Sequence, residues 1–300
     1  AYLVYASSWI KYHEPAAFCA ALINAQPMGF WSPHTLVQDA RRHGVTVRTP
    51  DLNASLAGAT LEDDGTSVRL GLASVRSVGG ELAEQIEQER IEYGPYASPE
   101  DLVRRVPELT VAHLEAMATA GVFGESFGLD RREALWAAGA VAQSRPGRLP
   151  GIVTGERPPT LPGMTPVEES VADLWATGVS PDGHPTRFLR DELTGHGVVT
   201  AAGLEECEPQ SRVLVAGVVT HRQRPMTAQG VTFLSLEDET GLINVVVSKG
   251  CWARFRSVAR GASAMLIRGR LERSDGVINV VADHLSPLRT AAATTSRDFR

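Results

Sequence analysis

Apolar and polar positions in the first part of the chain follow the spacing of helices. Apolar residues recur at intervals of three and four over 18–25, which predicts helical structure from residue 8 to about 25. Pro15 falls inside this stretch and is expected to start a second helix, where its missing N–H costs nothing. Ser32 before Pro33 predicts the start of the next helix, and Gly44 predicts its end.

Two features interrupt the helical pattern. Residues 58–72 alternate around Asp64 and Gly65, which predicts a β-hairpin. Residues 73–142 are helical in pattern, with short glycine turns. Proline and glycine then crowd residues 144–166, which predicts a linker before a short helix at 166–176.

From residue 211 the pattern changes to short apolar strands. A segment with helical spacing separates the third strand from the fourth, and Asp275-Gly276 predicts a turn between the last two. The expected elements are strands at 213–219, 231–236 and 242–247, a helix at 250–260, and strands at 264–271 and 277–282. Three strands, a helix and two strands is the order of an OB-fold barrel. The predicted fold class is therefore multidomain, α then β.

Composition excludes several classes of protein. No apolar run approaches the roughly 20 residues that a membrane span needs. The three cysteines, Cys19, Cys207 and Cys251, are far apart and form no C-x-x-C pair, which argues against disulfides and a structural zinc site. A reducing cytoplasm fits best. The chain starts within a pattern and without Met, and we expect it to be a fragment of a longer protein.

Charge is distributed unevenly along the chain. Residues 1–210 hold 16 basic and 28 acidic residues, a net charge of −12, whereas residues 211–300 hold 13 and 7, a net charge of +6. The C-terminal third is therefore the candidate surface for nucleic-acid phosphates.

A glycine-containing turn precedes a helical pattern at residues 75–86. In a helix-hairpin-helix, backbone N–H groups at such a turn point at a DNA phosphate, and glycine allows close approach. The candidate DNA-binding residues are Arg76, Val78, Gly79 and Gly80. An ordinary helix–helix turn explains the local pattern equally well. For the weaker copy at 120–124, the ordinary turn is preferred.

The predicted barrel supplies a second candidate site. OB-folds bind single strands on the face of strands two and three, flanked by the loops between strands one and two and between four and five. Those parts contain Arg222, Arg224, Phe233, Asn244, Arg268, Arg270 and Arg273. The arginines would attract phosphate and the phenylalanine ring could stack on a base. Taken alone, Phe233 fits a core position better.

Catalytic carboxylates of the kind that two-metal nucleotidyl transfer needs are not expected here. The acidic clusters 62–64 and 237–239 accompany glycine turns, where acidic residues are usually solvated. We therefore assign no catalytic residue, no metal ligand and no cofactor to this chain.

Several stretches in order resemble the C-family bacterial DNA polymerases of the replicative alpha-subunit type. Residues 8–18 look like the part of the fingers domain that follows the palm. Residues 69–80 and 131–136 resemble the entry and exit of the tandem helix-hairpin-helix domain, and 233–241 resembles the OB domain. Residues 24–33 and the stretch 161–166 before Thr177-Gly178 are similar to the error-prone, damage-inducible branch.

The resemblance implies a domain order and a parent enzyme. The order is the C-terminal part of the fingers at 1–57, the helix-hairpin-helix domain at 58–143, a linker with short helices at 144–210, the OB-fold at 211–289 and a disordered tail at 290–300. The parent would be a cytoplasmic, Mg²⁺-dependent polymerase of translesion synthesis and the SOS response. Its palm carboxylates lie upstream of the matched part, so this chain alone is expected to be inactive.

The resemblance also implies partners. These are primer–template DNA, single-stranded DNA and a mutagenesis partner resembling an inactive lesion-bypass polymerase, which would reach the sliding clamp indirectly. No membrane is expected. Two other functions stay open from the residues alone: an OB-fold that binds RNA or tRNA, and a protein-interaction module that uses the acidic region as a docking platform.

Overall fold

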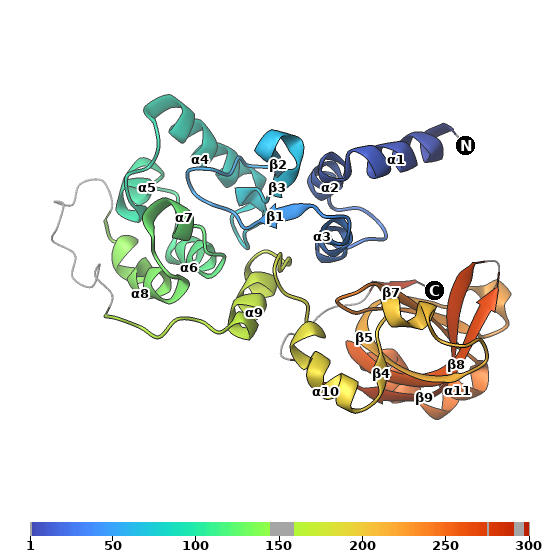
Figure 1. Cartoon of the computed structure of the whole chain (residues 1–300). Helices are drawn as coiled ribbons and strands as arrows, with labels where there is room; N and C mark the ends of the chain where they lie inside the picture. Colours follow the sequence, from blue (N-terminus) through green and yellow to red (C-terminus); the bar gives the residue numbers. More distant parts are fainter. Residues whose placement is uncertain (1, 145–158, 275, 291–296, 300) are drawn as a thin grey trace. The chain divides into compact units, whose positions relative to one another are not determined.

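The computed structural model describes residues 2–144, 159–274, 276–290 and 297–299 (Figure 1). The chain divides into a helical unit, Ala1–Pro181, and a barrel unit, Asp182–Arg300. The order α then β, with an OB-fold at the end, confirms the predicted fold class. Among the described residues, no helix is both long and apolar enough to cross a membrane.

The helical unit begins with three helices and a small sheet. The helices are α1 (Tyr2–His13), α2 (Pro15–Asn24) and α3 (Pro33–Arg42), and the strands are β1 (Thr46–Arg48), β2 (Thr60–Glu62) and β3 (Ser67–Arg69). Strand β3 lies between β1, to which it is parallel, and β2, to which it is antiparallel. The β2–β3 hairpin and the start of α2 at Pro15 confirm the sequence predictions. The Ser32 hydroxyl accepts a hydrogen bond from the Thr35 N–H at 3.2 Å, which caps α3.

Six further α-helices lie in the described part of this unit. They are α4 (Gly79–Tyr93), α5 (Pro99–Arg105), α6 (Val111–Thr119), α7 (Gly124–Phe127), α8 (Arg131–Val141) and α9 (Pro166–Ala176). Their apolar faces meet in one core, in which Ile86, Leu102 and Met117 are fully buried. Ala176, the last residue of α9, belongs to the same core. Helix α9 therefore packs with the helix-hairpin-helix region, although it follows the predicted linker.

The barrel unit starts with α10 (Arg190–Gly195) and β4 (Val198–Val199), which pairs with the first barrel strand. The barrel itself comprises β5 (Arg212–Gln223), β6 (Thr232–Glu237), β7 (Leu242–Val247), β8 (Ala264–Ser274) and β9 (Val277–Pro287). The strands pair in the order β5-β6-β7-β9-β8, and β8 pairs again with β5, which closes the ring. Closure leaves no free edge in the ring. Two short helices, α11 (Lys249–Arg254) and α12 (Arg256–Gly261), connect β7 to β8.

Two segments differ from the domain order expected from the sequence. Residues 144–210 are divided between the units, because the division falls after Pro181 and Leu204 lies in the barrel core. The tail was expected to be disordered over 290–300, but Arg297–Phe299 form strand β10, parallel to β5. Residues 145–158 of the predicted linker and Asp275 of the predicted turn lie outside the described residues.

Candidate nucleic-acid interface

The first glycine turn leads directly into α4. Ser77 and Gly79 have φ angles of 67° and 68°, so the chain turns sharply before the helix. The Val75 and Val78 side chains are buried and fix the turn to the core. Gly79 and Gly80 are exposed, and a Cβ built on either would meet no atom within 4 Å. The start of α4 is thus open to close approach by a ligand.

Backbone N–H groups at this helix start are available for an anion. The first N–H groups of a helix have no intrahelical acceptor. Among the residues that the structure describes, no side chain caps the N-terminus of α4. Of the four hairpin residues predicted from sequence, Val78 contributes its backbone only, because its side chain is 6% exposed.

Arg76 lies beside this turn and is held by α9. Its guanidinium carbon is 4.8 Å from the centroid of the Trp175 ring. The backbone N–H of Arg76 donates a hydrogen bond to the Ala176 carbonyl at 2.6 Å. Arg76 is exposed, and within the described residues no carboxylate forms a salt bridge with it. The sequence pattern gave no sign of Trp175, since 99 residues separate it from Arg76.

The second glycine turn is covered by the protein itself. Gly121 has a φ of +79°, and the Arg131 Nε lies 3.0 Å from the position that a Cβ on Gly121 would take. Arg131 in turn pairs with Asp173 of α9 at 2.7 Å. A phosphate would have to displace this pair, so the geometry favours the ordinary turn at residues 120–124.

The outer surface of strands β6 and β7 forms the second candidate site. Phe233 pairs with Val246 and Ser235 with Asn244, and all four side chains face outward. We call these four residues the β6–β7 face. Phe233 is 41% exposed, so the alternative that it is a core residue is wrong. Asn244 is exposed as expected.

Arg222 does not belong to this surface. It is 7% exposed, its Nε donates to the Ala259 carbonyl at 2.9 Å, and its Nη2 donates to the Ala262 carbonyl. The expectation that Arg222 faces phosphate is therefore corrected: the side chain points inward and fixes the end of α12. Arg224, two residues later, is exposed and lies over the Trp252 ring, 5.8 Å from its centroid.

The three predicted arginines of β8 are exposed but already engaged. Arg268 pairs with Asp283 at 2.7 Å and Arg270 with Glu272 at 2.6 Å. Arg273 donates to the Glu205 carbonyl at 2.8 Å. Strand β8 pairs with β9 and β5 rather than with β6 or β7. The structure thus separates these arginines from Phe233 and Asn244, with which they were predicted to act.

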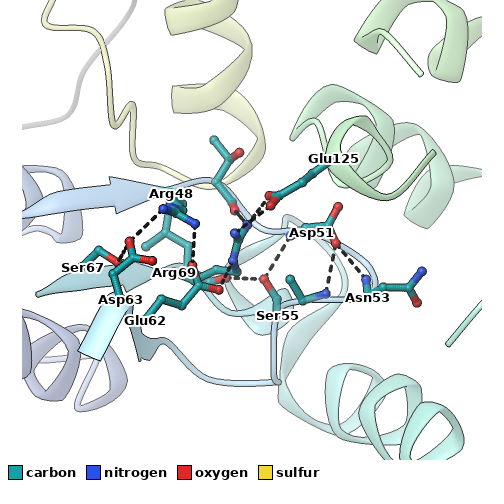
Figure 2. Close-up of polar contacts among 12 residues, drawn as sticks. Arg48, Asp51, Asn53, Ser55, Glu62, Asp63, Ser67, Arg69 and Glu125 are labelled. Atoms are coloured by element: carbon teal, nitrogen blue, oxygen red, sulfur yellow. Dashed lines mark hydrogen bonds and ion pairs between the residues drawn. The ribbon is translucent and has the colours of Figure 1, made fainter. Parts of the chain in front are cut away.

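In the acidic cluster at residues 62–64, Asp63 and Asp64 are exposed as expected, while Glu62 and Asp63 also belong to an ion-pair network. Figure 2 shows Arg69 between Glu62 and Glu125. Arg69 is 2% exposed and donates to Glu62 at 2.5 Å and to Glu125 at 2.8 Å. Arg48 pairs with Glu62 and Asp63 at 3.2 and 2.8 Å. These carboxylates are committed to structure.

The second acidic cluster is structural too. The Asp238 carboxylate accepts from the N–H groups of Thr240 and Gly241, which closes the turn before β7. Glu239 pairs with Arg190 of α10. In the described residues, no group of three or more His, Cys, Asp or Glu side chains could hold a metal ion.

The two candidate sites coincide with two domain models. Residues 44–134 match a model described as a helix-hairpin-helix motif, and residues 213–288 match an OB-fold nucleic acid binding domain. An error-prone DNA polymerase from Mycolicibacterium paratuberculosis is 59% identical over 298 residues, which is 99% of this chain and 27% of that protein. One from Nocardia farcinica is 56% identical, with 99% of this chain and 26% of that protein covered.

The chain corresponds to the C-terminal part of the error-prone DNA polymerases. It spans about a quarter of the length of the relatives that it matches. Among solved structures, an asparaginyl-tRNA synthetase from Pyrococcus horikoshii is similar to part of this chain. The alignment covers 32% of this chain and 23% of the synthetase chain, at 20% identity and a TM-score of 0.27. Gly79, Gly80 and Phe233 fall within the matched models, whereas Trp175 of α9 lies outside both.

Proposed function

We propose that this chain is the DNA-holding part of an error-prone polymerase that acts in translesion synthesis and damage-induced mutagenesis. The helix-hairpin-helix region would hold duplex backbone, and the barrel would hold single-stranded template. The observation that carries the proposal is the joint presence, in one chain, of the open glycine turn before α4 and the exposed β6–β7 face with Phe233.

The two surfaces suit different forms of DNA. Backbone N–H groups at a helix start contact phosphate without reading sequence, which suits duplex. An exposed ring on a barrel strand stacks on an unpaired base. Together they predict a preference for a primer–template junction, where both forms of DNA meet.

The remaining parts of the proposal concern the whole enzyme. Polymerisation would require the upstream carboxylates and Mg²⁺, so the isolated chain is expected to be inactive. In the cytoplasm, recruitment would depend on a mutagenesis partner resembling an inactive lesion-bypass polymerase, with the sliding clamp contacted through that partner. Pull-down of such a partner by the full-length enzyme, with and without this part, tests the recruitment.

The direct test is fluorescence anisotropy of labelled DNA against the chain over a salt series. Single-stranded, duplex and primer–template DNA of equal phosphate number are compared. We expect the tightest binding at the junction and a steep loss of affinity with salt. Absence of binding to all three at low salt, with the protein folded, would overturn the proposal.

An RNA loop of equal charge serves as the competitor. The barrel model that matches residues 213–288 is described as binding nucleic acid in general, so the test must separate DNA from RNA. Tighter binding of the RNA loop than of the junction would favour an RNA-binding OB-fold instead.

A further inference from the structure

Much of the excess positive charge of residues 211–300 lies on the helices between β7 and β8. Residues 249–260, which we call the cap segment, contain Lys249, Arg254, Arg256 and Arg260, and all four are exposed. The sequence has no Asp or Glu between Glu239 and Glu272. Within the described residues, none of the four cations forms a salt bridge. This surface is therefore positively charged without a local counter-charge.

Three other arginines of the barrel are already engaged within the protein. Arg268 and Arg270 are paired with Asp283 and Glu272, and Arg222 is buried against carbonyl groups. An arginine already paired with a carboxylate gains less from a phosphate, because the first pair must be broken or shared. A cation of the cap segment can contact a phosphate without the loss of an existing ion pair.

Helix electrostatics account for only some of the cap cations. Arg254 and Arg260 lie in the last turns of α11 and α12, where a cation is favourable. Lys249 is instead the first residue of α11, where the helix dipole disfavours positive charge, and Arg256 lies between the end of α11 and the start of α12, whose dipoles act on it in opposite directions. The helix dipoles therefore do not explain a cation at Lys249 or at Arg256.

The cap segment adjoins the β6–β7 face through the loop between β5 and β6. Arg224 of that loop lies over Trp252 of α11, and the Lys249 Cδ is 3.5 Å from the position of a Cβ on Gly230. Phe233 follows the same loop and pairs with Gln223. A nucleic-acid strand with a base stacked on Phe233 would thus lie next to Arg224 and the start of α11.

We propose that the cap segment is a phosphate-binding surface that extends the single-strand path beyond the β6–β7 face. The ligand is the sugar–phosphate backbone of single-stranded nucleic acid, bound by charge without reading of bases. The inference rests on the proposed function of the barrel, since the bases of the same strand occupy the β6–β7 face.

The test compares two variants with equal change in charge. One is K249Q/R256Q in the cap segment, and the other is R268Q/R270Q on β8. Anisotropy is measured with oligothymidines of about 5 and about 15 nucleotides, the shorter covering little more than one face. Thermal melting checks the fold, and we expect K249Q/R256Q to melt close to the wild type because both side chains are exposed.

We expect K249Q/R256Q to weaken binding of the longer strand about three- to tenfold at low salt and to lower the salt slope by about 0.7 for each lost phosphate contact. The shorter strand should be affected less, and R268Q/R270Q should change either affinity less than K249Q/R256Q does. Equal losses for both strand lengths, or a larger loss from R268Q/R270Q, would overturn the inference.

Three further outcomes are distinguishable. If the wild type binds no single strand at low salt, the proposed function itself fails. If the wild type binds and F233L weakens binding while K249Q/R256Q does not, only the cap inference fails. Competition by polyglutamate as strong as that by an oligothymidine of equal charge would show a general anion surface and would also overturn it.

Discussion

The guanidinium of Arg76 lies over the indole ring of Trp175, 4.8 Å from its centroid, although the two residues are far apart in the sequence. This contact joins α9 to the turn before α4. A hydrogen bond from the backbone N–H of Arg76 to the Ala176 carbonyl joins the same two segments. A cation held over a ring loses mobility while its N–H groups stay free at the ring edge. Trp175 thereby positions Arg76 beside Gly79 and Gly80.

Removal of the Trp175 ring should weaken duplex binding. We expect W175L to lower affinity about two- to fivefold, the size of an exposed cation–π contact, and W175F to retain most of it. R76A should lower affinity at least as much, and W175L should add little to R76A. Anisotropy with duplex DNA and a double-mutant cycle measure the coupling.

The matched control is Trp136 on α8, which is 58% exposed and forms no cation–π contact with an arginine among the described residues. W136L should leave duplex binding unchanged. Additive losses from R76A and W175L would show that Trp175 does not act through Arg76.

Gly80 offers a variant that separates binding from stability. A Cβ at Gly80 meets no atom within 4 Å, and its φ is not left-handed, so G80A should fit without strain. Alanine in place of an exposed helical glycine stabilises by up to about 1 kcal/mol. The methyl group would nevertheless stand where a phosphate must approach, and we expect about tenfold weaker duplex binding.

Gly139 in α8 is the control, because a Cβ there also meets nothing within 4 Å. Urea melts of G80A and G139A should both be unchanged or shifted to higher midpoints. Only G80A should lose duplex affinity. Unchanged affinity in G80A would remove the turn before α4 from the interface.

The order of strands and helices in the barrel followed from apolar periodicity, but the direction of one side chain did not. Strict alternation places Arg222 on the side opposite the core residue Val219. The pairing of β5 with β6 shifts between Val219 and His221, and this bulge turns Arg222 inward, opposite Leu234. A single unpaired residue moves every later side chain of the strand to the opposite face of the sheet. The amino-acid sequence shows no pattern that predicts this bulge.

Other parts of the site required the tertiary structure. The glycine turn before α4 was recognisable because glycine has a local conformational role. The ion pair of Arg268 depends on Asp283, which strand pairing brings close, and the contact of Trp175 with Arg76 depends on helix packing. The acid-free stretch around the cap segment was visible in the sequence, yet only exposure of Lys249 and Arg256 makes it a surface.

Arg222 and Arg224 should give opposite phenotypes. R222M leaves the carbonyl groups of Ala259 and Ala262 without this donor, which should cost about 2–4 kcal/mol of unfolding free energy. R224M changes an exposed side chain and should alter stability by less than about 1 kcal/mol. Single-strand affinity should fall in R224M. Chemical denaturation together with anisotropy distinguishes the two, and equal stabilities would contradict the buried role of Arg222.

His34 should make stability depend on pH. Loss of solvent around the imidazole, with Arg41 and Arg42 nearby, lowers the pKa of His34 to about 4. Its Nδ1 accepts a hydrogen bond from the Ser180 N–H at 3.4 Å, which requires the neutral ring. Because the unfolded chain binds the proton more tightly, stability is full above the unfolded pKa of about 6.5 and falls as pH drops towards 4.

The expected loss is about 1–2 kcal/mol between pH 7 and pH 5, since His34 is only half-buried. Urea unfolding at both pH values measures it. H34Q lacks the titrating group and should be less sensitive to this change of pH than the wild type. An equal dependence in H34Q would assign the effect to other groups.

Phe233 should carry base stacking on the barrel. Its ring is 41% exposed on β6, between Gln223 and Val246 on the neighbouring strands. Stacking of one base on an aromatic ring contributes about 1–3 kcal/mol, so F233L should weaken single-strand binding about fivefold or more. F233Y keeps the ring and should bind nearly as well as the wild type. Because the side chain is not in the core, F233L should melt close to the wild type, and an unchanged single-strand affinity in a folded F233L would exclude the β6–β7 face as the stacking surface.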